Sequence, residues 1–293
     1  MSWLKITFAS SKDQLDFLSD KLELAGAQAV TIEDAGDNPL FDLLDGELPV
    51  WESSQVTGLF NAEQGLDAVS ADLTKAFAPA ALPQHHVESL PDQDWERCWM
   101  DRFQPMQYGD NLWICPTWYE PPDSEATNIM LDPGLAFGSG SHETTRLCME
   151  WLSKQNLAGK AIIDYGCGSG ILAIAALKLG AASALGIDID PQALQASRQN
   201  AQLNQVSEKL QLGLPADMPG HIQCDVVMAN ILADTLIELK AHLLSFRKPR
   251  GVLVLSGILK SQQALIYKTF EPANTIEVYN DGDWMMMTVI SQS

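Results

Sequence analysis

The feature that most limits how this chain can fold is a glycine-rich turn, Asp164-Tyr165-Gly166-Cys167-Gly168-Ser169-Gly170. It follows a short apolar run at residues 161–164 and precedes a segment of helical character at residues 171–179. Glycines allow a tight strand-to-helix turn in which the backbone approaches a ligand closely, and the helix N-terminus behind it favours electron-rich groups. The pattern predicts a cofactor bound at the end of a strand, with a plain tight turn as the simpler alternative.

The spacing within the turn discriminates between cofactors. A dinucleotide fingerprint reads G-x-G-x-x-G, whereas this turn reads G-x-G-x-G with Asp164 two residues before its first glycine. S-adenosylmethionine carries an amino acid and a sulfonium instead of a pyrophosphate, so a nearby carboxylate favours its binding. Asp188 ends the next apolar run, 18 residues after Gly170, where it can accept hydrogen bonds from ribose hydroxyls. The cofactor is predicted to be S-adenosylmethionine, and an NAD-dependent reductase is disfavoured.

Strand and helix patterns alternate through the C-terminal two-thirds of the chain. Alternation of this kind predicts a parallel sheet covered by helices on both faces. A hairpin around Asp281 and Gly282 is expected to add an antiparallel edge. The expected domain, residues 105–293, is therefore a doubly wound, mostly parallel seven-stranded α/β sheet. Its strands are expected at residues 161–164, 184–188, 210–214, 225–229, 252–255, 275–279 and 284–290, and its helices at residues 171–179, 191–203 and 233–244.

Residues 1–91 have the order βαββαβ, which predicts an N-terminal ferredoxin-like α+β domain. Residues 92–104 are expected to form a helical linker, in which Trp95 and Trp99 lie one turn apart and pack between domains. The strands of the first domain are expected at residues 3–8, 28–33, 55–60 and 85–90. One helix is expected at residues 12–25, with the apolar face Leu15, Leu18 and Leu22, and a second at residues 63–77, with the apolar face Leu66, Val69 and Leu73.

Composition excludes several classes of function. The chain has 18 Lys and Arg against 38 Asp and Glu, a net charge of -20, and no dense basic run, so direct nucleic-acid binding is not expected. Such acidity suits a small or basic partner, although it also simply favours solubility. The five cysteines show no CxxC spacing, which indicates neither disulfides nor zinc and favours the cytoplasm. No signal peptide or membrane span is expected, and no metal, because His142 has no His or Cys nearby.

Two further segments are candidates for the site. Asn230 ends the fourth apolar strand, at the edge where doubly wound sheets bind ligands, so it is a candidate to touch both cofactor and acceptor. The following Ile-Leu-Ala, in place of Pro-Pro and an aromatic residue, argues against a stacked nucleobase as substrate. The glycine-rich loop at residues 131–146 could close over the cofactor, with Thr145 contributing a hydroxyl. A strand-end turn and an ordinary capped loop are the alternatives.

Together with the turn, several segments resemble the bacterial ribosomal protein L11 methyltransferases, the PrmA family, over nearly the whole chain. The loop at residues 131–145 departs from the family, which usually has threonine at Ser139 and Ser141 and commonly proline at Glu143, but it keeps the hydroxyls. The other matching segments are Asp94-Trp95-Glu96-Arg97, Leu112-Trp113-Ile114-Cys115-Pro116, Gly186-Ile187-Asp188-Ile189-Asp190-Pro191, Ala229-Asn230-Ile231-Leu232-Ala233 and Leu255-Ser256-Gly257-Ile258-Leu259.

The resemblance implies a class I methyltransferase domain behind a small, hinged domain that recognises a basic ribosomal protein. It implies that Thr145, Gly166, Asp188 and Asn230 contact S-adenosylmethionine. Gly168 of the turn is a further candidate to contact the cofactor, and Asn230 is the candidate catalytic residue, which would orient the attacking amine. The family trimethylates the N-terminal amine and lysine amines of ribosomal protein L11. Two alternatives stay open: a methyltransferase of the same fold acting on another protein or a small molecule, and a cofactor-binding assembly protein without catalysis.

Overall fold

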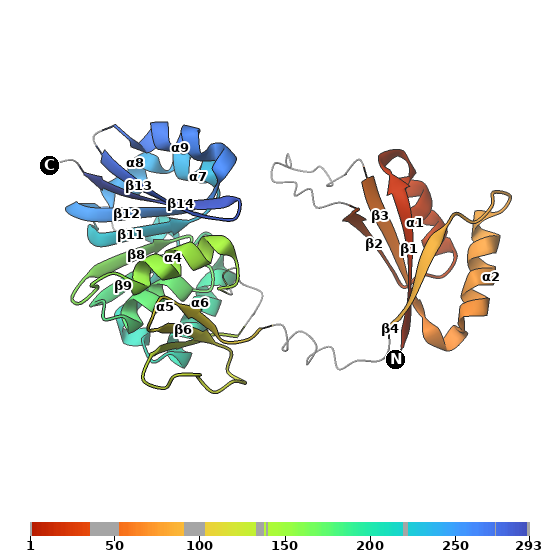
Figure 1. The fold of residues 1–293 in the computed structure, drawn as a ribbon, viewed down its shortest axis with the longest axis horizontal. Helices are drawn as coiled ribbons and strands as arrows, with labels where there is room; N and C mark the ends of the chain where they lie inside the picture. Colours follow the sequence, from red (N-terminus) through yellow and green to blue (C-terminus); the bar gives the residue numbers. More distant parts are fainter. Residues whose placement is uncertain are drawn as a thin grey trace. The chain divides into compact units, whose positions relative to one another are not determined.

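The computed structural model describes residues 2–35, 53–90, 103–132, 138, 140–218, 222–272 and 274–291. The chain divides into two compact units, Met1–Met100 and Asp101–Ser293 (Figure 1). The expected linker helix, with Trp95 and Trp99, lies outside the described residues. Within the described ranges, no helix is both long enough and apolar enough to cross a membrane.

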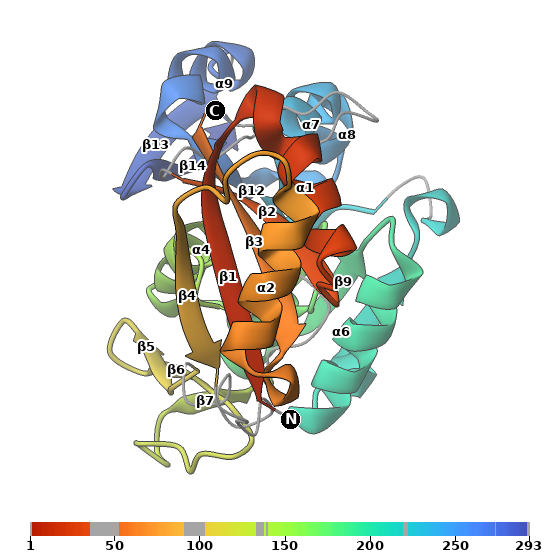
Figure 2. The ribbon, with the colours of Figure 1, turned by 90° about the vertical axis from the view of Figure 1, so that its right-hand side faces the viewer.

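The N-terminal unit is a four-stranded antiparallel sheet with strand order β2-β3-β1-β4. Two helices, α1 and α2, cover one face of this sheet (Figure 2). All six expected elements are present within a few residues of their expected ends, and Gly26, with φ +94°, follows the first helix. The elements are β1 (Trp3–Ser11), α1 (Leu15–Leu24), β2 (Ala29–Asp34), β3 (Ser53–Asn61), α2 (Leu66–Phe77) and β4 (His85–Leu90).

Alternate residues of β1 build the core of this unit. Leu4, Ile6 and Phe8 are buried against the predicted apolar faces of both helices. Leu66 is the exception, because it is 45% exposed and belongs to no buried cluster. The helical spacing was predicted correctly, but spacing along a helix does not decide how far the core extends beneath its first turn.

The C-terminal unit is built on a seven-stranded sheet of order β10-β9-β8-β11-β12-β14-β13. The first five strands in this order run parallel, and the β13–β14 hairpin adds the expected antiparallel edge, with Gly282 at φ +53° in its turn. The strands are β8 (Ala161–Tyr165), β9 (Ser183–Ile187), β10 (Leu210–Gly213), β11 (Cys224–Asn230), β12 (Arg247–Leu259), β13 (Asn274–Asp281) and β14 (Trp284–Ser291).

Helices bury both faces of this sheet, as the alternating pattern predicts. Side chains of successive strand residues point to opposite faces, so Ile162 joins one core and Ile163 the other. The first core contains residues of α4 (Glu143–Ser153), α5 (Ile171–Lys178) and α6 (Pro191–Leu203). The second contains residues of α7 (Ala233–Glu238), α8 (Lys240–Ser245) and α9 (Gln263–Phe270).

The structure corrects the sequence-based expectation in two places. The single helix expected at residues 233–244 is wrong, because it breaks into α7 and α8 at Leu239, where ψ is 1°. Its apolar spacing continues across the break, so periodicity did not reveal it. The prediction also missed α9 and a separate three-stranded sheet, whose strands are too short to show a period: β5 (Met106–Tyr108), β6 (Leu112–Cys115) and β7 (Thr127–Met130).

Candidate functional site

The candidate site lies where the order of the parallel strands reverses. Strand β8 is paired with β9 on one side and with β11 on the other, so the connections that follow β8 and β11 leave in opposite directions. Doubly wound sheets bind ligands in the crevice outside the carboxyl ends of such strands. The glycine-rich turn, Asp188 and Asn230 all lie at this edge.

The turn requires glycine for both conformation and space. Gly166, Gly168 and Gly170 have φ values of +75°, +53° and +78°, a region that L side chains seldom adopt. A Cβ atom on Gly166 would lie 2.4 Å from Cγ2 of Ile231, and one on Gly170 would lie 3.2 Å from the Cα atom of Ser197. The turn is therefore packed directly against the connections that follow β11 and β9. Because its glycines have no side chains, nothing of their own covers the backbone of the turn.

Asp188 ties the second strand to the turn. It follows directly after β9, whose last residue is Ile187. The Gly168 backbone N–H donates to its Oδ2 over 2.8 Å, and the Asp190 N–H donates to Oδ1 over 3.0 Å. Asp190 caps α6 by accepting from the Gln192 N–H, and Pro191 takes the first turn, as expected. The structure therefore brings the predicted residues Gly168 and Asp188 together.

Thr145 and Asn230, separated by 85 residues in sequence, also meet. The Asn230 Nδ2 donates to Thr145 Oγ1 over 3.3 Å, and Thr145 is 1% exposed in the first turn of α4. His142 caps this helix by accepting from the Thr144 N–H. This bond uses one of the two Nδ2 hydrogens, so the second N–H and the carbonyl oxygen of the Asn230 amide can both serve a ligand.

A bulge in β12 holds the segment after Asn230, and sequence reasoning did not assign it a place in the site. The pairing of β12 with β14 shifts register between Leu255 and Ile258. Gly257, at φ +84°, approaches Ile231 so closely that a Cβ atom would lie 2.3 Å from its carbonyl oxygen. Ser256 Oγ donates to the Thr144 carbonyl over 3.0 Å. The bulge thus fixes both Thr144 and Ile231, the neighbours of the two site residues.

Asp164 lies beneath the turn rather than in the open crevice. It is 1% exposed, its Oδ2 accepts from the Ala173 N–H over 3.1 Å, and its Oδ1 is buried without a hydrogen-bond partner. Burial raises the pKa of Asp164 to about 7, against the opposing effect of the Ala173 hydrogen bond and with a smaller upward contribution from Asp188. A cationic ligand in the crevice would stabilise the ionised form.

Two large apolar side chains stand open at the same edge, and sequence reasoning did not identify them. Ile189 is 81% exposed and follows Asp188, while Leu232 is 63% exposed and follows the Asn230–Ile231 pair. Apolar residues at a ligand-binding edge can cover the flat faces of a base or an alkyl chain. The exposed position of Ile189 directly after a carboxylate is the signal that could have revealed it.

The loop at residues 131–146 is described in part, since residues 133–137 and 139 lie outside the described residues. Ser169 Oγ of the turn donates to the Gly138 carbonyl over 2.7 Å, and Tyr108 donates to the Gly140 carbonyl over 3.0 Å. One described residue of the loop therefore touches the glycine-rich turn. Across the described parts of the chain, no group of three or more His, Cys, Asp or Glu side chains is arranged to hold a metal ion.

A doubly wound sheet with a G-x-G-x-G turn after its first parallel strand and a carboxylate after the next defines the class I methyltransferases. The family model for ribosomal protein L11 methyltransferase (PrmA) matches residues 2–292. The chain belongs to this family. It is therefore an S-adenosylmethionine-dependent methyltransferase.

Two named relatives match the sequence over all or nearly all of its length, and one solved structure matches about two thirds of it. A ribosomal protein L11 methyltransferase of Actinobacillus pleuropneumoniae serotype 3 (strain JL03) is 49% identical over 293 residues, with 100% of both chains covered. One from Edwardsiella ictaluri (strain 93-146) is 50% identical over 289 residues, covering 98% of this chain and 99% of its own. The crystal structure of a ribosomal protein L11 methylase from Lactobacillus delbrueckii subsp. bulgaricus has 34% identity and a TM-score of 0.60, covering 65% of this chain and 100% of that one.

Proposed function

We propose that the chain transfers methyl groups from S-adenosylmethionine to the N-terminal amine and lysine amines of ribosomal protein L11. The observation that carries this proposal is the match along the whole chain to relatives that bear the name of this activity. A methyltransferase acting on another protein or a small molecule would use the same fold, so the acceptor is the part of the proposal that needs a direct test.

The residues present fit S-adenosylmethionine. We assign its binding to Thr145, Gly166, Gly168, Asp188 and Asn230, which are the residues that meet at the carboxyl edge. The positive φ values of Gly166 and Gly168 form a tight turn whose backbone a ligand can approach closely. Asp188 carries a partly exposed carboxylate suited to ribose hydroxyls, with Ile189 beside it as an apolar wall. The orphaned, buried Oδ1 of Asp164 favours a positively charged ligand over a pyrophosphate.

When bound, S-adenosylmethionine supplies an electrophilic methyl group on a sulfonium centre. Asn230 is the candidate to orient the attacking amine. The hydrogen bond to Thr145 holds its amide in place, and its carbonyl oxygen can accept an N–H of the amine and hold the nitrogen in position. Positioning of this kind can supply most of a rate enhancement. A free lysine has a pKa near 10.4 and must lose a proton before it attacks. The described site offers no evident side-chain base, and we assign the proton to water.

The N-terminal unit is proposed to be a ferredoxin-like, substrate-recognising domain over residues 1–91, joined by a helical linker at residues 92–104 to the methyltransferase domain at residues 105–293. The antiparallel strand order β2-β3-β1-β4, with both helices on one face, supports the ferredoxin-like assignment. The division of the chain into two compact units supports a separate role for the first.

The charge of the chain supports a basic protein substrate and no direct nucleic-acid contact. The net charge is -20, and exposed carboxylates follow several strands at the carboxyl edge, including Asp190, Asp234 and Asp283. Opposite charge speeds encounter and positions an ammonium group near the crevice. We place this activity in the cytoplasm, where a ribosomal protein is available as substrate.

The proposal is tested by transfer of labelled methyl groups to purified ribosomal protein L11, followed by mass spectrometry of the modified amines. Full-length protein should label the N-terminus and lysines of L11. A chain shortened to begin at Pro105 should keep its affinity for S-adenosylmethionine but lose transfer to L11, because the turn, Asp188 and Asn230 lie downstream. Equal labelling of unrelated basic proteins would refute the substrate assignment. Full-rate labelling of L11 by the shortened chain would refute the role of the N-terminal unit.

A further inference from the structure

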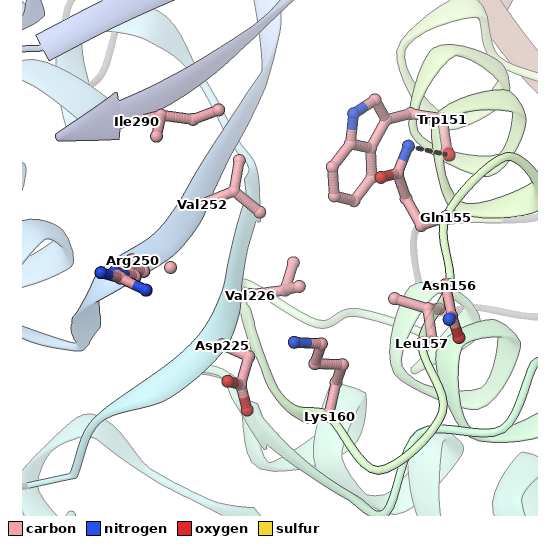
Figure 3. A pocket seen from close by; sticks show the side chains of 11 residues that line it. Trp151, Gln155, Asn156, Leu157, Lys160, Asp225, Val226, Arg250, Val252 and Ile290 are labelled. Atoms are coloured by element: carbon pink, nitrogen blue, oxygen red, sulfur yellow. Dashed lines mark hydrogen bonds between the residues drawn. The ribbon is translucent and has the colours of Figure 1, made fainter. Parts of the chain in front are cut away.

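A cavity of about 160 Å³ opens at the amino ends of β8, β11 and β12, at the other end of the sheet from the glycine-rich turn (Figure 3). Strands rise about 3.3 Å per residue, so the five residues of β8 separate the cavity from the turn by about 15 Å. A ligand held here would not compete for space with one bound in the crevice. The methyltransferase site leaves this cavity without a role.

One side of the cavity is apolar, while Gln155, Asn156, Lys160, Asp225 and Arg250 make the rest of its lining polar or charged. Trp151 of α4 faces Val226 of β11 and Val252 of β12, and Leu157 closes the side near the start of β8 (Figure 3). Trp151, Leu157 and Val226 are each less than 9% exposed, so they belong to the fixed core of the unit. The wall is thus preformed, and the flat indole surface suits a ring or a branched alkyl group.

Two of the polar residues of the lining are cations. Lys160, directly before β8, and Arg250 of β12 line the cavity, and within the described part of the chain neither forms an ion pair. Figure 3 shows the Lys160 side chain reaching toward Val226. Both side chains are exposed, so their donors are available to a ligand. Together they offer an ammonium and a guanidinium to one small cavity.

The lining also contains a carboxylate, Asp225, whose Oδ2 is already engaged by other donors. Asp225 Oδ2 already accepts from the Ala161 N–H and from Lys248 Nζ, each over 2.9 Å. Burial alone would raise the pKa of Asp225, but the Ala161 and Lys248 hydrogen bonds, with the charges of Lys248 and Lys160, outweigh burial and lower it. Two lysines, Lys248 and Lys160, therefore act on this carboxylate, and Arg250 is a further cation of the lining, in a chain whose net charge is -20. The local balance favours an anion.

We propose that this cavity binds a small organic carboxylate, with its apolar body against Trp151, Val226 and Val252 and its carboxylate between Lys160 and Arg250. A guanidinium matches a carboxylate with two parallel hydrogen bonds, and an ammonium adds a compact charge. The volume is below the range of about 300–1,000 Å³ typical of drug-sized ligands, so the ligand has one ring or a short branched chain. The site is independent of the identity of the methyl acceptor.

The test uses the full-length protein and phenylacetate as the probe, followed by calorimetry and ligand-observed magnetic resonance at low salt. Phenylacetamide, which has the same body without the charge, and inorganic phosphate, which has charge without the body, are the comparison ligands. Lys160→Gln and Arg250→Gln remove one cation each. Lys178→Gln is the matched control, because Lys178 is an exposed cation at the end of α5 that does not line the cavity.

Phenylacetate should bind to the wild-type protein, and each cavity variant should weaken binding about tenfold or more, as expected for a charge-assisted hydrogen bond. Phenylacetamide should bind at least about tenfold more weakly, while Lys178→Gln should leave phenylacetate binding unchanged. No binding of phenylacetate, equal binding of phenylacetamide, or equal weakening by Lys178→Gln would each overturn the proposal. Displacement of phenylacetate by equimolar phosphate would reduce the site to a general cationic patch and would also overturn it.

Discussion

Gly257→Ala tests whether the β12 bulge positions the catalytic edge. At φ +84° an alanine is strained, and its Cβ atom would lie 2.3 Å from the Ile231 carbonyl oxygen and 2.8 Å from the carbonyl carbon. These are backbone atoms, so no side-chain rotation relieves the clash. Either β12 or the segment after Asn230 must move.

The magnitude follows from two costs and one gain. A left-handed conformation costs an L residue about 1–2 kcal/mol, and overpacking adds about 1–3 kcal/mol. The loss of unfolded-state freedom returns about 0.4–1 kcal/mol. Gly257→Ala should therefore destabilise the protein by about 2–4 kcal/mol. Gly159→Ala is the matched control, because Gly159 has φ +73° with no atom within 4 Å of a built Cβ, and it should cost only about 1 kcal/mol.

The assay is equilibrium urea denaturation of both variants and the wild type, with hydrogen exchange at β11 and β12 amides to locate the loss. Gly257→Ala should also weaken binding of S-adenosylmethionine, since displacement of Ile231 moves Asn230, whereas Gly159→Ala should leave the affinity unchanged. Equal losses of unfolding free energy in the two variants would refute the close approach as the cause. An unchanged affinity in Gly257→Ala would refute its link to the site.

Three further predictions concern single site residues. Asp188→Ala should weaken S-adenosylmethionine binding by about 1.5–3 kcal/mol, measured by calorimetry. Asp188→Asn should weaken it by less, because one oxygen remains for the Gly168 N–H. An unchanged dissociation constant in Asp188→Ala would contradict the assignment. Burial raises the pKa of Asp164 to about 7 from an ordinary value near 4, so between about pH 4 and pH 7 the folded protein holds a proton that the unfolded chain releases, and this group's contribution to stability falls as the pH rises. Asp164→Asn cannot ionise, so its unfolding free energy relative to wild type should increase across this window. A constant difference would count against a buried acid. Thr145→Val should lower the rate of methyl transfer to L11, because Asn230 loses its hydrogen-bond partner, whereas Thr145→Ser should retain most of this rate. Equal rates in the two variants would show that the hydroxyl does not hold Asn230.

Part of the candidate site could be predicted from short stretches of the sequence. Residues 164–170 predicted a tight turn from a strand into a helix, and the structure has this turn, with its three glycines at φ values of +75°, +53° and +78°. Asp188 was expected to be the last residue of a strand that in the structure ends one residue earlier, at Ile187, and its hydrogen bond to the Gly168 N–H is a finding of the structure. The turn and the end of the strand depend on neighbours in sequence, because the handedness of a turn and the capping of a helix are local matters, whereas the contact of Asp188 with Gly168 depends on the pairing of β8 with β9.

The sequence by itself determined the alternation of strands and helices, the glycine-rich turn and the acidic residue that follows the second strand. Tertiary structure alone decided that Thr145 and Asn230 form a hydrogen bond across 85 residues, that Gly257 lies against Ile231, and that Asp164 is buried with one oxygen unpartnered. The physical reason is that conformational preference acts along the chain, whereas these contacts arise from strand order and helix packing. A hydrogen-bond partner, a steric limit or a shifted pKa exists once distant segments share the same small volume.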